Sequence, residues 1–261
     1  MQELTPAMKS SGAVPICVRL GEISGGNILD VCTQDGSFIG TMMKAFRNYD
    51  SFVGIDISEE NLEKARKKFS DEPVEFILMN TESLIFDDDS FDTVCISHSI
   101  HHLENPIHVL KEMLRVLKPG GHLILQELFC DDNQSEAKQT DILIHHWGAK
   151  IDTMRGEPHF ETLPRKQIRN FVTALGLNDI EEFESKRYVK CLFCENQEKC
   201  EDPMNSIDFA IEEVDRVLQR IVDHPEYNKF GQEAHLLRER IRTTGFESAS
   251  LLFFICKKNL Q

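Results

Sequence analysis

The sequence has few positive charges. It contains 29 Lys and Arg residues against 44 Asp and Glu residues, which gives a formal net charge of −15. Phosphate backbones and anionic lipid surfaces are both bound through clustered Lys and Arg side chains. We therefore expect neither a nucleic acid nor a membrane among the partners of this chain. The excess of acid instead favours solubility.

The sequence also lacks a long apolar run. No segment has the roughly 18 apolar residues needed to cross a bilayer. The first residues do not combine a basic start with an apolar stretch, as a signal peptide does. These absences predict a cytoplasmic protein with reduced thiols. Five cysteines stand singly and are expected to be small core residues: Cys17, Cys32, Cys95, Cys130 and Cys256.

Short apolar runs alternate with amphipathic helical patterns through the first half of the chain. Continuous apolar strands separated by helices predict a doubly wound, mostly parallel α/β sheet with both faces covered. Ligands of such sheets bind beyond the carboxyl ends of the strands. The expected strands are 27–32, 51–56, 74–79, 91–97 and 122–128, and the expected helices are 37–46, 59–69 and 106–117.

The second half of the chain is less regular. Residues 130–161 show weak periodicity, and we interpret 131–161 as a cover over the strand ends. The whole chain is interpreted as one domain, with an N-terminal cap at 1–25 and an insertion at 189–246 before the last strand. The other expected elements are helices at 163–175, 206–222 and 230–243 and strands at 179–188 and 249–256.

Polar residues follow the first three expected strands. The loop from Asp30 to Gly36 offers a carboxylate and a glycine at a helix start, which suits a small polar ligand. Asp56 ends the second strand, where a carboxylate can accept both hydroxyls of a ribose. After the third strand, the amide of Asn80 could bond an adenine edge, while Thr81 is equally explained as a helix cap.

Four segments, in order, resemble one known family. ILDVCTQDGSF, VGIDIS, NTESLIFDDDSFDTVCISHSIHHLENP and VLKPGGHLIL are similar to the class I methyltransferases that use S-adenosylmethionine (SAM), in particular the small-molecule branch of ubiquinone/menaquinone-biosynthesis type. The resemblance spans residues 26–130. It implies a Rossmann-like, seven-stranded sheet whose antiparallel last strand, 249–256, lies beside 179–188. It also implies SAM as cofactor and in-line methyl transfer to a small-molecule acceptor.

The resemblance also assigns the residues that contact SAM. In the family the loop after the first strand is usually Asp-x-Gly-x-Gly-x-Gly, whereas Cys32 and Gln34 stand at the first two glycine positions here. Since glycines let a backbone approach a ligand closely, this departure predicts weaker or tilted SAM binding, or a domain without turnover. The implied cofactor contacts are Asp30, Cys32, Gly36, Asp56, Ile57, Asn80, Thr81, Ser97 and His98.

A dinucleotide-binding protein is the competing interpretation of these motifs. Asp56 follows Gly36 at a spacing close to that of an NAD ribose acid. However, Gly-x-Gly-x-x-Gly is absent, and Asp30 would repel a pyrophosphate, so we favour SAM.

Methyl transfer requires the acceptor atom near 3 Å from the methyl group and in line with its bond to sulfur. A base helps where the acceptor carries a proton. The candidates to orient or deprotonate an acceptor are His98, His101, His102, Glu127, His145 and His146. His101 and His102 can instead form a packing turn. His145, His146 and Trp147 can instead lie on a buried helix face.

Three further cysteines, Cys191, Cys194 and Cys200, lie in a polar stretch. Their thiolates can bind zinc with a fourth ligand from His224, His235 or solvent. They can also hold an iron–sulfur cluster or capture a soft metal or metalloid. The second CxxC of the strong zinc pattern is missing, so unligated thiols are the alternative.

Three functions are compatible with these observations. The first is a SAM-dependent methyltransferase with a small-molecule acceptor. The second is a SAM-binding or metal-sensing module without turnover, suggested by Cys32, Gln34 and the thiol cluster. The third is a protein-binding scaffold that keeps the fold without the cofactor. No sequence feature specifies an oligomeric state.

Overall fold

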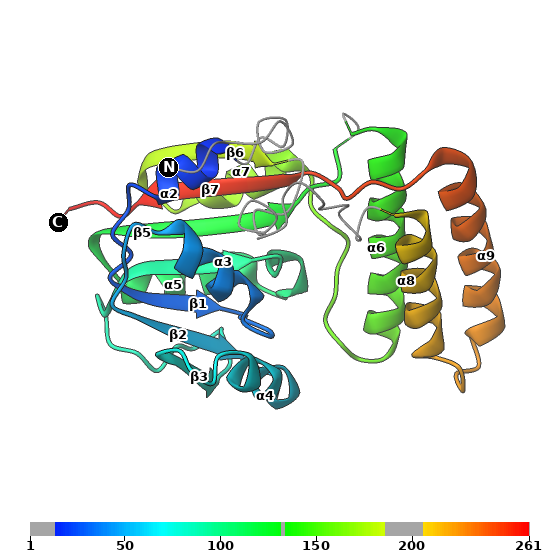
Figure 1. The fold of residues 1–261 in the computed structure, drawn as a ribbon, viewed down its shortest axis with the longest axis horizontal. Helices are drawn as coiled ribbons and strands as arrows, with labels where there is room; N and C mark the ends of the chain where they lie inside the picture. The colour runs from blue at the N-terminus through cyan, green and yellow to red at the C-terminus, as the bar shows by residue number, and fades with distance from the viewer. Residues whose placement is uncertain (1–13, 132–133, 186–205, 261) are drawn as a thin grey trace.

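The structure is a computed structural model that describes residues 14–131, 134–185 and 206–260. One seven-stranded sheet has the order β3-β2-β1-β4-β5-β7-β6 (Figure 1). Only β7 runs antiparallel to its neighbours, β5 and β6. The expected doubly wound sheet with an antiparallel last strand is therefore confirmed. The strands are β1 (Asn27–Val31), β2 (Ser51–Asp56), β3 (Val74–Leu78), β4 (Phe91–Ser97), β5 (Leu117–Leu128), β6 (Asn178–Ser185) and β7 (Leu251–Lys257).

Helices cover both faces of the sheet. On one face, α2 (Val14–Leu20), α3 (Ser37–Ala45) and α4 (Glu59–Lys68) contribute to a shared apolar core. On the other face, α5 (Pro106–Val116) and α7 (Arg165–Ala174) pack against a second core. These two layers bury the continuous apolar strands, as a parallel sheet requires.

Local signals set the helix starts. Ser58 caps α4, because its hydroxyl accepts the backbone N–H of Asn61 at 3.3 Å. Asn105 caps α5 in the same way, through the N–H of His108, and Pro106 occupies the first turn. Such caps satisfy N–H groups that have no partner within the helix.

The Lys118–Gly121 segment lies between the expected helix 106–117 and the expected strand 122–128, but it is not a loop. It belongs to β5, whose first residue, Leu117, pairs with Phe91 of β4 across an irregularity in the register. Gly120 has a φ of 76°, and a Cβ at Gly121 would lie 2.7 Å from the backbone oxygen of Asp92. The strand therefore begins before residue 122 because the glycines permit a bend and a close approach of two backbones.

A third apolar core lies between α6 (Glu136–Met154), α8 (Ile207–Gln219) and α9 (Tyr227–Thr244). Figure 1 shows these helices side by side, beyond the carboxyl ends of the parallel strands. Val214 and Leu218 of α8 pack in this core. Among the described residues, no helix combines the length and the apolar character needed to cross a membrane.

The weak periodicity of residues 130–161 conceals a helix of 19 residues, α6. A one-sided apolar stripe is the signature of a helix with one buried face. α6 instead buries residues on more than one side, and several of them are polar. Its buried residues are Lys138, Thr140, Ile142, Ile144, Trp147, Gly148, Ala149, Ile151 and Asp152.

Candidate functional site

A cavity of about 270 Å³ opens at the carboxyl ends of β1 and β4. The strand order reverses between these two strands, with β2 and β3 on one side and β5 on the other. Open α/β sheets bind their ligands at such a switch point. The residues that line the cavity are Asp30, Cys32, Thr33, Gln34, Asp35, Ser37, Phe38, Thr41, Ser97, His98 and Gln126.

The loop between β1 and α3 follows a glycine-type path. Cys32, Gln34 and Gly36 have φ angles of 58°, 50° and 74°. These are the three positions at which the resemblance implies glycine. Left-handed backbone costs an ordinary residue about 1–2 kcal/mol, so two strained residues border the cavity. The departure from glycine therefore changes the side chains that the loop presents, while the backbone at both positions has the left-handed φ angles that glycine adopts without strain.

Asp56, at the end of β2, holds this loop. Its Oδ2 accepts the backbone N–H of Gln34 at 2.9 Å, and its Oδ1 accepts the N–H of Ser58 at 2.9 Å. The residue is only 6% exposed. An ionised carboxylate has about four acceptor sites, so these two bonds leave capacity for a diol.

Asp30 is a buried acid beside the cavity. Its Oδ2 accepts the hydroxyl of Thr33 at 2.6 Å. Burial, together with the nearby charge of Asp56, raises the pKa of Asp30 to about 7 against the effect of that bond. A cationic ligand would favour the ionised form of Asp30.

Cys32 carries a protonated thiol. Burial raises its pKa to about 12, and the charges of Asp56 and Asp30 act in the same direction. The thiol lies beside the hydroxyls of Thr81 and Ser99. Since the thiolate is the reactive form, Cys32 shapes the site and is not a nucleophile.

The predicted cofactor residues divide into two groups. Asp30, Cys32, Ser97 and His98 line the cavity, whereas Gly36, Asp56, Ile57, Asn80 and Thr81 lie outside its lining. The Oδ1 of Asn80 accepts the N–H of Glu82 at 2.9 Å, which is the local turn that competes with adenine binding. The side chain of Ile57 is 75% exposed beside Asp56.

Several lining residues escaped the sequence analysis. The cavity side of the loop and of α3 is formed in part by Thr33, Asp35, Phe38 and Thr41. These positions carry no residue type that is specific for a cofactor. Gln126 was also missed, and its neighbour Glu127 was predicted instead. Side chains alternate along a strand, so only one of these two neighbours can face the cavity.

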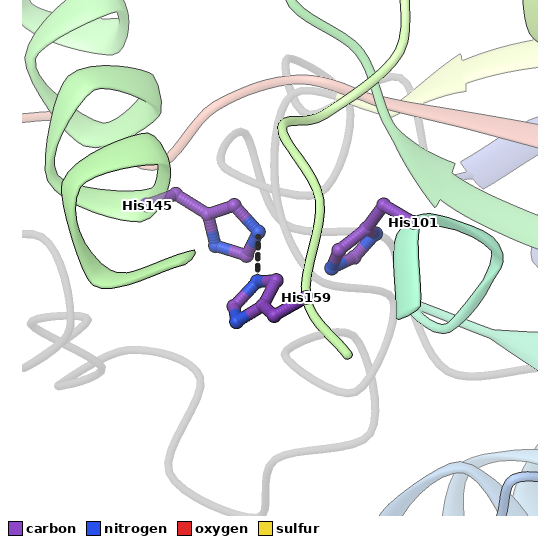
Figure 2. A group of neighbouring side chains, drawn as sticks. All are labelled: His101, His145 and His159. Atoms are coloured by element: carbon purple, nitrogen blue, oxygen red, sulfur yellow. Dashed lines mark hydrogen bonds between the residues drawn. The ribbon is translucent and has the colours of Figure 1, made fainter. Parts of the chain in front are cut away.

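Four imidazole rings gather beyond the ends of β4 and β5: His101, His102, His145 and His159. Five pairs among them have ring centroids 4.0 to 5.4 Å apart. Figure 2 shows three of the rings approaching from separate segments, namely α6, the loop after it, and η1 (Ile100–His102). His159 was not among the predicted site residues, whereas the other three were.

Glu127 of β5 holds His101 of this cluster in place. The carboxylate is fully buried and accepts the N–H of Ile100, the N–H of Leu128 and the Nδ1–H of His101 at 2.8 to 2.9 Å. Burial acts to raise the pKa of Glu127, but the charge and hydrogen bond of His101 hold it below its usual value. With its oxygens so occupied, Glu127 positions η1 and does not line the cavity.

The neighbours of His145 on α6 point elsewhere. The ring of His146 bonds to Thr162, through the hydroxyl at 2.7 Å and the backbone N–H at 3.1 Å. Trp147 packs in the helical core, with its ring centroid 6.4 Å from that of Phe230. Of the three, His145 alone joins the histidine cluster. The predicted metal ligands Cys191, Cys194 and Cys200 lie outside the described residues.

Sequence comparisons agree with this geometry. Residues 29–125 match the family described as "Methyltransferase domain". Demethylmenaquinone methyltransferase of Lactococcus lactis subsp. lactis is 35% identical over 112 residues, which are 42% of this chain and 44% of that protein. The ubiquinone/menaquinone biosynthesis C-methyltransferase of Geobacter sulfurreducens is 34% identical over 115 residues, with the same shares. The matched stretch spans less than half the length of either relative.

Solved structures share the fold. The [4+2]-cyclase SpnF has a TM-score of 0.59 at 18% identity, over 95% of this chain and 81% of that chain. A phosphoethanolamine N-methyltransferase 2 of Haemonchus contortus, in complex with phosphomonomethylethanolamine and S-adenosylhomocysteine, has a TM-score of 0.56 at 18% identity, over 95% and 52%. The resemblance to class I methyltransferases is thus confirmed. A cyclase among these neighbours means that the fold alone does not set the reaction.

Proposed function

We propose that this chain, which carries a methyltransferase domain at residues 29–125, is a SAM-dependent methyltransferase for a small-molecule acceptor. The observation that carries the proposal is the cavity at the switch point. There a buried acid, Asp30, and a left-handed loop held by Asp56 meet the start of α3. Helix starts and glycine-type loops bind polar ligands through their backbone N–H groups.

The residues present fit SAM. SAM supplies a methyl group on a positively charged sulfur, and it also carries an ammonium and a ribose. Asp30 offers a buried carboxylate to a cationic ligand. Asp56 retains acceptor capacity for the ribose hydroxyls. The exposed side chain of Ile57 beside it offers an apolar surface to the adenine ring. Ser97 and His98 line the cavity at the end of β4, where the methionine part is expected.

Within the cavity, His98 is the best-placed candidate to orient the acceptor or to take its proton. It has a φ of 51° and donates its backbone N–H to the carbonyl of Gln126 at 2.9 Å. A strained backbone at a site is a mark of function. Glu127 and His146 already form hydrogen bonds within the protein, so we assign them to holding η1 and Thr162 in place and not to proton transfer.

A quinol-type acceptor is the first to test, because the named relatives act in menaquinone and ubiquinone biosynthesis. The family match ends at residue 125, before α6, α8 and α9. These helices stand at the carboxyl ends of the strands (Figure 1), on the side from which an acceptor approaches. We therefore expect these helices, which lie outside the family match, to complete an acceptor pocket that begins at His98.

The test is calorimetry followed by turnover. The purified chain is titrated with SAM and with S-adenosylhomocysteine, and then incubated with SAM and a panel of acceptors that includes demethylmenaquinol. We expect binding of both compounds and release of S-adenosylhomocysteine with at least one acceptor. Absence of any binding would overturn the proposal and favour a scaffold.

The second candidate is a SAM-binding module without turnover. The observation that favours it is the pair of strained side chains, Cys32 and Gln34, at glycine positions of the loop. The same experiment separates the two functions, because binding without product from any acceptor would favour the module.

A further inference from the structure

The histidine cluster contains a constellation suited to a metal ion. One ring nitrogen from each of His101, His145 and His159 lies within 4.8 Å of the other two. The Nε2 atoms of His145 and His159 are 3.1 Å apart (Figure 2). A zinc ion bound at about 2.0–2.1 Å in tetrahedral geometry would place its ligand nitrogens about 3.4 Å apart. The longest of these separations thus needs to shorten by at most about 1.4 Å, and the His145–His159 pair is already within about 0.3 Å of the required spacing.

Two of the rings are oriented as metal ligands usually are. The Nδ1–H of His101 donates to Glu127 at 2.8 Å, and the Nδ1–H of His159 donates to Asp152 at 2.8 Å. These bonds leave the Nε2 of each ring as the atom that faces the cluster. A ligating histidine typically donates its other ring N–H to a carboxylate, which sets the tautomer and strengthens the ligand.

The surroundings favour a cation. The ring of His101 is 2% exposed and that of His159 is 10% exposed. The ring of His145 lies against both, with its centroid 4.8 Å from that of His101 and 4.8 Å from that of His159. Carboxylates lie behind two of the rings, Glu127 behind His101 and Asp152 behind His159, and Asp152 also forms an ion pair with Arg220 at 2.5 Å.

We propose that His101, His145 and His159 bind one divalent transition-metal ion of the zinc class. Imidazole nitrogens suit zinc, and sites with three protein ligands keep a fourth position open for water or substrate. None of the three histidines lines the SAM cavity, so the site is additional to the cofactor site. It is also distinct from the thiol cluster expected from the sequence.

The open position is suited to an oxygen of the acceptor, a step that rests on the proposed methyltransferase function. The SAM cavity and the histidine cluster adjoin at β5, where Gln126 lines the cavity and the next residue, Glu127, points to the opposite face of the strand and orients His101. His98, which also lines the cavity, lies near enough for its charge to lower the pKa of Glu127. Metal uptake itself is independent of SAM, so failure of one proposal is distinguishable from failure of the other.

The test uses the full chain with Cys191→Ser, Cys194→Ser and Cys200→Ser, so that thiolates cannot contribute. After chelation and removal of the chelator, the protein is titrated with Co²⁺ and followed by visible absorption, without SAM or acceptor. We expect one equivalent of Co²⁺, with the intense bands of a four-coordinate site and no sulfur-to-metal charge transfer.

Variants in the same background assign the ligands. His145→Gln and His159→Gln should lower Co²⁺ affinity at least 100-fold, whereas His235→Gln, an exposed histidine of α9, should leave it unchanged. Asp152→Asn keeps all three rings and should weaken binding roughly 10- to 100-fold. Circular dichroism checks that each variant is folded. No Co²⁺ uptake by the parent chain, or full uptake by the folded His145→Gln or His159→Gln variant, would overturn the proposal.

Discussion

The Oδ2 of Asp56 accepts the backbone N–H of Gln34 at 2.9 Å. This bond joins the end of β2 to the loop after β1, at the residue that stands in place of a glycine. The two strongest features of the sequence, the acid and the unusual loop, are therefore parts of one structure. A ligand that binds the acid also meets the loop.

Asp56→Ala should weaken binding of S-adenosylhomocysteine by about 1–3 kcal/mol, because the ribose loses its acceptor and the N–H of Gln34 loses its partner. Calorimetry measures the affinity. The matched control is Asp71→Ala, an exposed acid away from the cavity, for which we expect no change. Equal affinities for the two variants would remove Asp56 from the cofactor site.

Gln34→Gly should leave the chain at least as stable as the natural sequence and bind SAM more tightly. Glycine adopts a φ of 50° without strain, and it lets the ligand approach the backbone. Gln34→Ala keeps the strain and is the control, which we expect to be less stable than Gln34→Gly by about 1 kcal/mol. Urea unfolding and calorimetry measure both effects. A more stable alanine variant would contradict the assigned loop conformation.

The stability of the ligand-free chain should fall as the pH rises from about 4 to about 7, through the contribution of Asp30. Burial raises its pKa in the folded chain to about 7, whereas an unfolded Asp titrates near 3.9. The folded state therefore holds the proton more tightly, and this contribution is complete at low pH and lost above 7.

Asp30→Asn isolates that contribution, because its side-chain oxygen can still accept the hydroxyl of Thr33. Urea unfolding of both chains at pH 5 and at pH 8 gives the difference. We expect the variant to gain stability relative to the natural chain by up to a few kcal/mol at the higher pH. A difference that is independent of pH would show that Asp30 does not titrate in this range.

Glu127→Gln should destabilise the chain by about 2–5 kcal/mol. The carboxylate is fully buried and accepts three hydrogen bonds, whereas an amide turns one acceptor into a donor that faces other donors. Thermal and urea unfolding measure the loss. Glu104→Gln changes an exposed acid nearby and should have no effect. A loss no larger than that of the control would mean that Glu127 does not hold η1 and His101.

Local patterns were sufficient for most of the sheet. Apolar runs bounded by polar turns placed β2 and β4 at their observed residues, and the helix expected at 59–69 begins where α4 begins. Each of these signals acts within a few residues, through caps, turns and the alternation of strands with helices. The carboxyl ends of β1 and β4 were likewise expected to hold the ligand, and the cavity lies there.

Such patterns did not predict contacts between residues that are far apart in the sequence. α6 escaped because helices that follow it in the chain by more than 50 residues bury its other sides. The sequence suggested adenine binding for the amide of Asn80 and a helix cap for Thr81. In the structure the oxygen of Asn80 accepts the N–H of Glu82 in a local turn. No helix lies within residues 79–90, the described segment between β3 and β4, so the cap interpretation was wrong. The direction in which a side chain points depends on neighbours that are distant in sequence, and local patterns do not identify them.

By itself, the sequence determined where most of the strands lie along the chain and which acids follow them, because hydrophobic periodicity and turn chemistry act locally. The antiparallel last strand was implied only by the family resemblance, and the strand order came from the structure. Only the tertiary structure decided that His101, His145 and His159 face one another. They come from η1, α6 and the loop after it, and no spacing along the chain encodes their meeting. It results from the packing of a helical layer against the end of the sheet, where side chains distant in sequence share one buried volume.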